Sequence, residues 1–164
     1  LIILHTMGSH GPAYYKRYPK RFEKFKPVCK TNQLEKCSKE EIINAYDNTI
    51  LYSDYFLDKS INFLKRYKDA KRALIYISDH GESLGEGGLY LHGMPYFIAP
   101  DAQKHVAAFI WLGDNLKKEI DTNYLRSLQN KKLHQNILFH TLLAIFDVNS
   151  SVYKEDLNIL KRRD

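Results

Sequence analysis

The chain has 164 residues, of which 44% are hydrophobic and 27% are charged, a composition typical of one folded domain and not of a disordered segment. Its formal net charge of +6 permits an anionic partner such as nucleic acid, anionic lipid or a phosphorylated substrate, and a solvated basic surface explains the charge equally well. No apolar run reaches the roughly 18 residues of a transmembrane helix, and the opening residues lack the basic flank of a signal peptide.

The first predicted element is a buried strand over Leu1–Leu4, because these four residues form an unbroken apolar run. The run leads into a loop that contains His10 and Gly11. Domain boundaries normally fall in polar linkers, whereas this sequence opens on an apolar strand. We therefore expect the sequence to be a piece of a longer protein, cut inside or next to a strand.

Cys29 and Cys37 lie close together in a polar, turn-like stretch. In an oxidising compartment this spacing closes a small disulfide loop, whereas in the cytosol the same residues are two ordinary thiols. No further Cys or His stands nearby at zinc-finger spacing, which argues against a structural zinc ion.

A long helix is predicted to begin after Ser38 and to end at about Tyr67, because its apolar residues recur at helical spacing. Ser38 and Glu41 have the spacing of a capping box, the signature of a helix start. Beyond the helix we expect strands over Ala73–Ile77 and His105–Leu112 and a helix over Leu133–Phe146. The histidines of that last helix, at 134 and 140, are interpreted as structural.

Asp79 and His80 come directly after the strand Ala73–Ile77, which is predicted to be buried on both faces. A glycine-rich loop then leads to His92. Ligands of α/β proteins bind outside the carboxyl ends of strands, and carboxylate and imidazole groups are good zinc donors. A plain turn, in which Asp79 caps backbone amides, explains the local pattern equally well. If Leu1–Leu4 lies in the same parallel sheet, His10 reaches the same edge, and this convergence favours a site.

Four segments taken together resemble the phosphoethanolamine transferases that modify lipid A, a family that includes the mobile colistin-resistance enzymes. The resemblance extends over about residues 1–145 and corresponds to the C-terminal part of the catalytic domain. It implies that 1–164 lacks the upstream part of that domain and the N-terminal membrane helices. The segments are HTMGSHGPAYYKRYP, AYDNTILYSDYFLD, SDHGESLGEGGLYLHG and PDAQKHVAAFIWL.

The resemblance implies an alkaline-phosphatase-like or sulfatase-like α/β/α sandwich, anchored in the bacterial inner membrane with its catalytic domain in the periplasm. It also implies transfer of phosphoethanolamine from phosphatidylethanolamine to lipid A or another periplasmic acceptor. In this family a threonine nucleophile carries the group as a phospho-threonine, and zinc is held by a glutamate, that threonine and an Asp-His pair.

By motif match, Asp79 and His80 are the zinc ligands, and His10 and His92 are the catalytic histidines that contact the transferred group or a second zinc ion. Cys29 and Cys37 match a disulfide of the family. The nucleophile and the glutamate ligand lie upstream of residue 1 in the family, and the threonines at 6, 31 and 49 do not match the nucleophile. These residues alone are therefore expected to be inactive and to bind zinc weakly.

Two alternatives remain. A sulfatase, phosphodiesterase or phosphoglycerol transferase shares the same fold, although the SDHGESLGE and LHG motifs favour the phosphoethanolamine transferases. A non-catalytic basic module would use Lys16 and Arg17 instead of Asp79. We expect no nucleic-acid partner.

Overall fold

The structure is a computed structural model, and it describes residues 1–163. The chain forms two compact units, which we describe one at a time. The first unit comprises residues 1–64 and 75–110, and the second comprises residues 65–74 and the chain from Trp111 onward. All the candidate site residues predicted from the sequence belong to the first unit.

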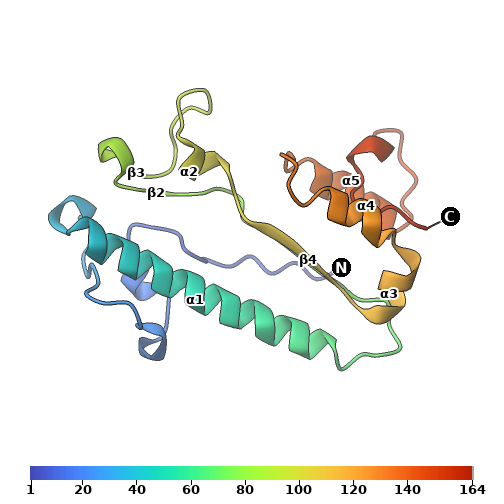
Figure 1. Cartoon of the computed structure of the whole chain (residues 1–164), viewed down its shortest axis with the longest axis horizontal. Coiled ribbons are helices and arrows are strands. Elements are labelled where there is room, and N and C mark those ends of the chain that lie inside the picture. Colours follow the sequence, from blue (N-terminus) through green and yellow to red (C-terminus); the bar gives the residue numbers. More distant parts are fainter. Residues whose placement is uncertain (164) are drawn as a thin grey trace. The chain divides into compact units, whose positions relative to one another are not determined.

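The longest element is helix α1, Lys39–Leu64 (Figure 1). It begins with the predicted capping box: Ser38 N–H donates to Glu41 Oε2 at 2.8 Å, and Glu41 N–H donates to Ser38 Oγ at 3.2 Å. These two bonds satisfy backbone donors that a helix start leaves unpaired. The helix ends at Leu64, slightly before the predicted end at Tyr67.

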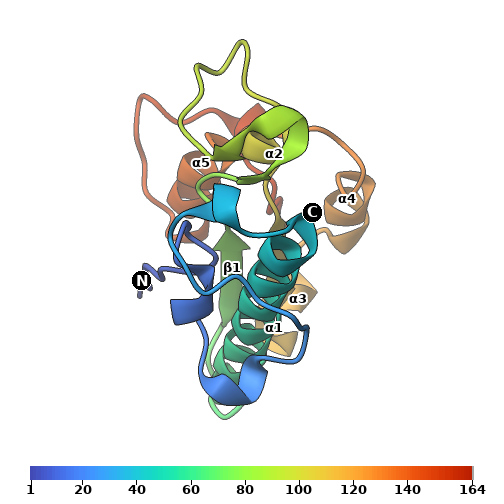
Figure 2. The same cartoon turned by 90° about the vertical axis from the view of Figure 1, so that its left-hand side faces the viewer.

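The segment before α1 winds around it as short 3-10 turns, η1 (Tyr14–Lys16), η2 (Lys20–Phe22) and η3 (Leu34–Lys36), drawn in blue in Figure 2. Asn48, fully buried in α1, holds part of this segment in place. Its Oδ1 accepts the N–H groups of Lys24 and Phe25 at 2.7 and 3.0 Å, and its Nδ2 donates to Phe25 O at 2.9 Å. A polar side chain in the helix interior thus serves as a partner for loop backbone that has no secondary structure.

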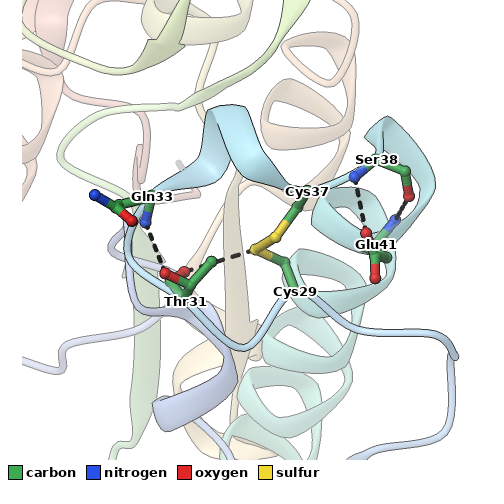
Figure 3. Close-up of a disulfide and its surroundings, with 6 residues drawn as sticks. All are labelled: Cys29, Thr31, Gln33, Cys37, Ser38 and Glu41. Carbon is green, nitrogen blue, oxygen red and sulfur yellow. Dashed lines mark hydrogen bonds between the residues drawn. A yellow bond between two sulfur atoms is a disulfide. The ribbon is translucent and has the colours of Figure 1, made fainter.

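Cys29 and Cys37 form a disulfide with Cα atoms 5.7 Å apart, so the predicted bridge is confirmed (Figure 3). Cys29 is buried and belongs to the main hydrophobic cluster of this unit. Leu84 and Leu91, from the glycine-rich region, pack against the same cluster. The cluster comprises Tyr14, Val28, Cys29, Leu34, Ile42 and Ala45.

Two small sheets follow. Strand β1, Ala73–Ile77, pairs with β4, Ala108–Leu112. Strands β2, Ser83–Leu84, and β3, Tyr90–Leu91, form an antiparallel hairpin. The predicted strand at 73–77 is confirmed, although its residues are half-buried and not buried on both faces. Strand β4 begins three residues later than the predicted start at His105.

The prediction of a buried strand over Leu1–Leu4 is wrong. These residues have no regular secondary structure, and between 64% and 84% of each is exposed. A strand needs a neighbour for its backbone hydrogen bonds, and residues 5–163 place no strand against this segment. The apolar pattern is therefore present without the pairing that would bury it.

Short helices account for the rest of the described chain. Helix α2, Asp101–Lys104, precedes β4, and the second unit contains α3 (Asp114–Glu119), α4 (Thr122–Ser127), α5 (Ile137–Ile145) and the 3-10 turn η5 (Glu155–Leu157). Helix α5 is shorter than the predicted helix Leu133–Phe146. Over residues 1–163, no helix combines the length and apolar character needed to cross a bilayer.

Candidate metal centre

Three histidines from three separate segments form one group. His10 lies in the loop after the opening residues, His80 follows β1, and His92 follows β3. One ring nitrogen of each can be chosen so that all three lie within 4.8 Å of one another. The ring centroids of His80 and His92 are 3.7 Å apart and stacked, and His10 lies 5.1 Å from His92 and 5.5 Å from His80. The structure thus brings together three of the four side chains that the sequence analysis selected.

Asp79, the fourth predicted residue, lies at the edge of this group. Its carboxylate is 75% exposed, and Oδ1 is 3.8 Å from Nε2 of His80. The same oxygen accepts the His80 backbone N–H at 3.1 Å, as the plain-turn alternative expects. Both interactions occur together, so the capping bond does not prevent Asp79 and His80 from facing one ion.

Glu82, which is not among the residues predicted from the sequence, lies against two of the histidines. Only 4% of its side chain is exposed. Its Oε1 accepts the N–H of Gly11 at 2.9 Å and lies 3.3 Å from His92 Nδ1 and 3.9 Å from His10 Nδ1. Its Oε2 accepts a short hydrogen bond from the hydroxyl of Tyr14. One buried carboxylate therefore contacts two of the three histidines.

Glu82 points inward because the chain turns sharply at Gly81. The Gly81 N–H donates to Gln103 O at 3.1 Å, and a Cβ atom at Gly81 would lie 2.0 Å from the backbone oxygen of Ala102. The next side chain is held as well: Gln103 Nε2 donates to Ser83 Oγ at 2.9 Å. The motif contained a glutamate after a glycine, but nothing local in it indicated that helix α2 would turn this glutamate toward the histidines.

Burial and the hydrogen bond to Glu82 raise the pKa of Tyr14 well above its usual value. Burial and the charge of Glu82 also raise the pKa of Tyr46, whose ring meets the ring of Tyr14 edge-on at 5.6 Å. Desolvation disfavours the charged phenolate. Tyr14 is consequently a protonated hydrogen-bond donor across the physiological pH range.

The backbone at position 11 can lie close to Glu82 only because the residue there is glycine. A Cβ atom there would lie 2.4 Å from Leu91 Cδ2 and 2.8 Å from both Glu82 Oε2 and the Tyr14 hydroxyl. Leu91, the residue before His92, adopts a φ of 64°, a left-handed conformation that is costly for a non-glycine residue. The close packing at Gly11 and the strained backbone at Leu91 together fix the position of His92 after β3.

The side chains present suit a zinc-type ion. Imidazole nitrogens and a carboxylate oxygen are ligands that zinc accepts, and they favour it over magnesium or calcium, which prefer oxygen alone. Metal-binding histidines characteristically direct their second ring nitrogen to a carboxylate, and Glu82 is such a carboxylate for His92. The donor set therefore fits the predicted cofactor.

Comparison with known proteins shows the family of the chain. A family model described as Sulfatase matches residues 1–148. The chain belongs to the sulfatase family, and the expected sulfatase-like α/β fold is confirmed.

Within that family, the chain is similar to enzymes named as phosphoethanolamine transferases. It is 49% identical over 165 residues to phosphoethanolamine transferase EptA of Escherichia coli K12, in an alignment that covers 98% of this chain and 30% of that protein. The chain thus spans about a third of the length of that curated relative.

Solved structures give the same result. The C-terminal periplasmic domain of phosphoethanolamine transferase EptC from Campylobacter jejuni superposes with a TM-score of 0.86 at 50% identity, covering 96% of this chain and 51% of that one. The integral membrane lipooligosaccharide phosphoethanolamine transferase A of Neisseria meningitidis gives a TM-score of 0.94 at 42% identity, covering 98% and 31%.

Proposed function

We propose that the full-length protein is a zinc-dependent transferase that moves phosphoethanolamine from phosphatidylethanolamine to lipid A or to another periplasmic acceptor. The observation that carries the proposal is the group formed by His10, His80 and His92. It occurs in a chain 49% identical to a protein named phosphoethanolamine transferase EptA. Because the chain spans only part of that relative, the activity, the substrates and the partners of the whole protein are inferences.

In this proposal Asp79 and His80 hold zinc together with a glutamate and a threonine from outside the sequence. Zinc bound there would lower the pKa of the threonine hydroxyl and polarise a phosphoryl oxygen. His10 and His92 contact the transferred group, where they donate hydrogen bonds to the phosphoryl oxygens or exchange a proton with the leaving oxygen, or they bind a second zinc ion. Glu82 is the carboxylate that orients these two imidazoles.

The transfer takes two displacements at phosphorus. In the first, the threonine oxygen bonds to the phosphorus of phosphatidylethanolamine, the bond to the glycerol oxygen breaks, and diacylglycerol leaves with a proton. In the second, an oxygen of a lipid A phosphate bonds to the same phosphorus, the bond from phosphorus to the threonine oxygen breaks, and that oxygen takes up a proton from the acceptor phosphate to restore the hydroxyl. Dividing the reaction through a phospho-threonine is ordinary covalent catalysis.

We infer that the protein lies in the bacterial inner membrane with these residues in the periplasm, and that helices outside the sequence supply the anchor. The disulfide between Cys29 and Cys37 supports an oxidising compartment. Two structural relatives, one a periplasmic domain and the other an integral membrane protein, support the same location.

The proposal is tested by expressing the full-length protein in a Gram-negative host and measuring lipid A by mass spectrometry. We expect phosphoethanolamine-bearing lipid A with the wild type and none with Asp79→Ala or His80→Ala. His134→Ala is the matched control, because His134 is exposed and lies outside the histidine group. A zinc chelator should abolish transfer by the purified protein, and added zinc should restore it.

Equal modification by the wild type and by His80→Ala would refute the proposed site. No modification by any variant would instead direct attention to other acceptors, and then to a sulfatase, a phosphodiesterase or a phosphoglycerol transferase on the same fold. Loss of modification in a Lys16 and Arg17 double variant, with Asp79→Ala fully active, would favour a basic lipid-binding module.

A further inference from the structure

Tyr14 is a buried hydroxyl-bearing residue to which the proposed reaction assigns no role. Only 1% of it is exposed, and its hydroxyl donates to Glu82 Oε2 across 68 positions of sequence. Buried tyrosine hydroxyls need a partner, and a buried carboxylate is costly unless donors surround it. The contact between Tyr14 and Glu82 therefore satisfies two groups that would each be destabilising alone.

The position of the Tyr14 ring is determined by the core and not by the site. The ring belongs to the hydrophobic cluster that includes Cys29 of the disulfide and Ile42 of α1, and it meets Tyr46 edge-on. These neighbours come from segments that carry none of the three histidines. The hydroxyl thus approaches Glu82 from a rigid, well-packed base.

Two different donors hold the two oxygens of the Glu82 carboxylate. Gly11 N–H occupies Oε1, and the Tyr14 hydroxyl occupies Oε2. Within residues 1–163, Tyr14 is the only group that donates a hydrogen bond to Oε2. With both oxygens held, the carboxylate plane cannot rotate, and Oε1 stays between His92 Nδ1 at 3.3 Å and His10 Nδ1 at 3.9 Å.

A carboxylate facing Nδ1 favours the tautomer that carries its proton on Nδ1 and leaves the Nε2 lone pair free. For His10 and His92, the free Nε2 is then the atom available to a metal ion or to a phosphoryl group. If Oε2 lost its donor, the carboxylate could rotate, and both imidazoles would lose the oxygen that lies 3.3 Å from His92 Nδ1 and 3.9 Å from His10 Nδ1.

We propose that Tyr14 is a positioning residue that acts through Glu82 to orient His10 and His92 for catalysis. The inference rests on the proposed function for the role of the two histidines. It goes beyond that function by tying their orientation to a tyrosine in the structural core.

The test is a double-mutant cycle in the full-length protein with Tyr14→Phe, Glu82→Gln and both together. Tyr14→Phe keeps the ring, and with it the packing against Tyr46, and removes only the hydroxyl. Tyr15→Phe is the matched control, because Tyr15 is the adjacent residue and its ring lies against Lys16 Nζ, which is 5.5 Å from the ring centroid. Thermal unfolding establishes that each variant is folded at the assay temperature.

Two quantities are measured for each variant: kcat and KM for phosphoethanolamine transfer, and Zn²⁺ affinity by competition with a chelator. We expect Tyr14→Phe to lower kcat and to weaken Zn²⁺ binding by roughly 10-fold to 100-fold, the usual range for partners that orient metal ligands, with KM nearly unchanged. Tyr15→Phe should match the wild type. The double variant should be no worse than Glu82→Gln alone, because the two residues act in one chain of contacts.

Additive losses in the cycle, or Tyr14→Phe with wild-type kcat and Zn²⁺ affinity, would overturn the inference. Glu82→Gln breaks the same pair from the other side, so it must also weaken Zn²⁺ binding if the pair matters. Absence of transferase activity in the wild type would count against the proposed function only, because the Zn²⁺ cycle still tests the role of Tyr14.

Discussion

The disulfide gives a prediction whose size follows from the structure. Replacing both cysteines, Cys29→Ala with Cys37→Ala, opens a loop between residues eight positions apart. The chain-entropy relation for a loop of this length gives a destabilisation of about 2.5 kcal/mol at 25 °C. Because Cys29 is buried in the main hydrophobic cluster, the loss should lower the stability of the whole first unit and not only that of the loop.

Pulse proteolysis of the full-length protein across a urea series measures this change, since only unfolded molecules are cut. Wild type treated with reductant should approach the double alanine variant, and the variant itself should not respond to reductant. A variant as stable as the oxidised wild type would refute the reasoning, because it would mean that the cluster holds its shape without the covalent bond.

Two further predictions concern packing and backbone partners, and the same assay checks them. Asn48→Ala removes three part-buried hydrogen bonds between a fully buried side chain and loop backbone, and after the small helix-propensity gain of alanine it should cost about 2–3 kcal/mol. Asn44→Ala, which loses one exposed bond to Pro27 O, should change stability by under about 1 kcal/mol, and equal losses would contradict the account. Gly81→Ala places a Cβ atom 2.0 Å from Ala102 O and should destabilise the fold strongly. Gly87→Ala is its control: the φ of +60° strains the new residue, but no atom lies within 4 Å, so the loss of stability should be only roughly 1 kcal/mol.

Local chemistry explains which parts of the fold were predictable. The capping box of Ser38 and Glu41 operates within four residues, so its pattern is complete in the sequence, and helix α1 begins where expected. Strand β1 was equally clear from its apolar run. The strand predicted at Leu1–Leu4 failed because strand formation depends on a partner, which a hydrophobic pattern does not reveal.

In the candidate site too, residues set by a local pattern could be predicted, and residues set by distant contacts could not. The approach of His92 to His80 could be expected from the glycine-rich loop that joins them. The approach of His10 was expected from a strand over Leu1–Leu4 that the structure does not contain, so the reason given for it was wrong. Glu82 could not be expected, because its inward direction depends on the contact of Gly81 with Ala102, about twenty residues further along the chain. Tyr14 was hidden for the same reason: its partner is 68 residues away.

The close packing at Gly11 has a consequence for how such a sequence can change over evolutionary time. A single side-chain atom at this position would press on Leu91, Glu82 and Tyr14 at once. A viable replacement at Gly11 would therefore have to be accompanied by changes among these neighbours. Random drift rarely supplies such combinations. Substitutions near the histidines should therefore accumulate on the exposed surface around them and leave this four-residue contact untouched.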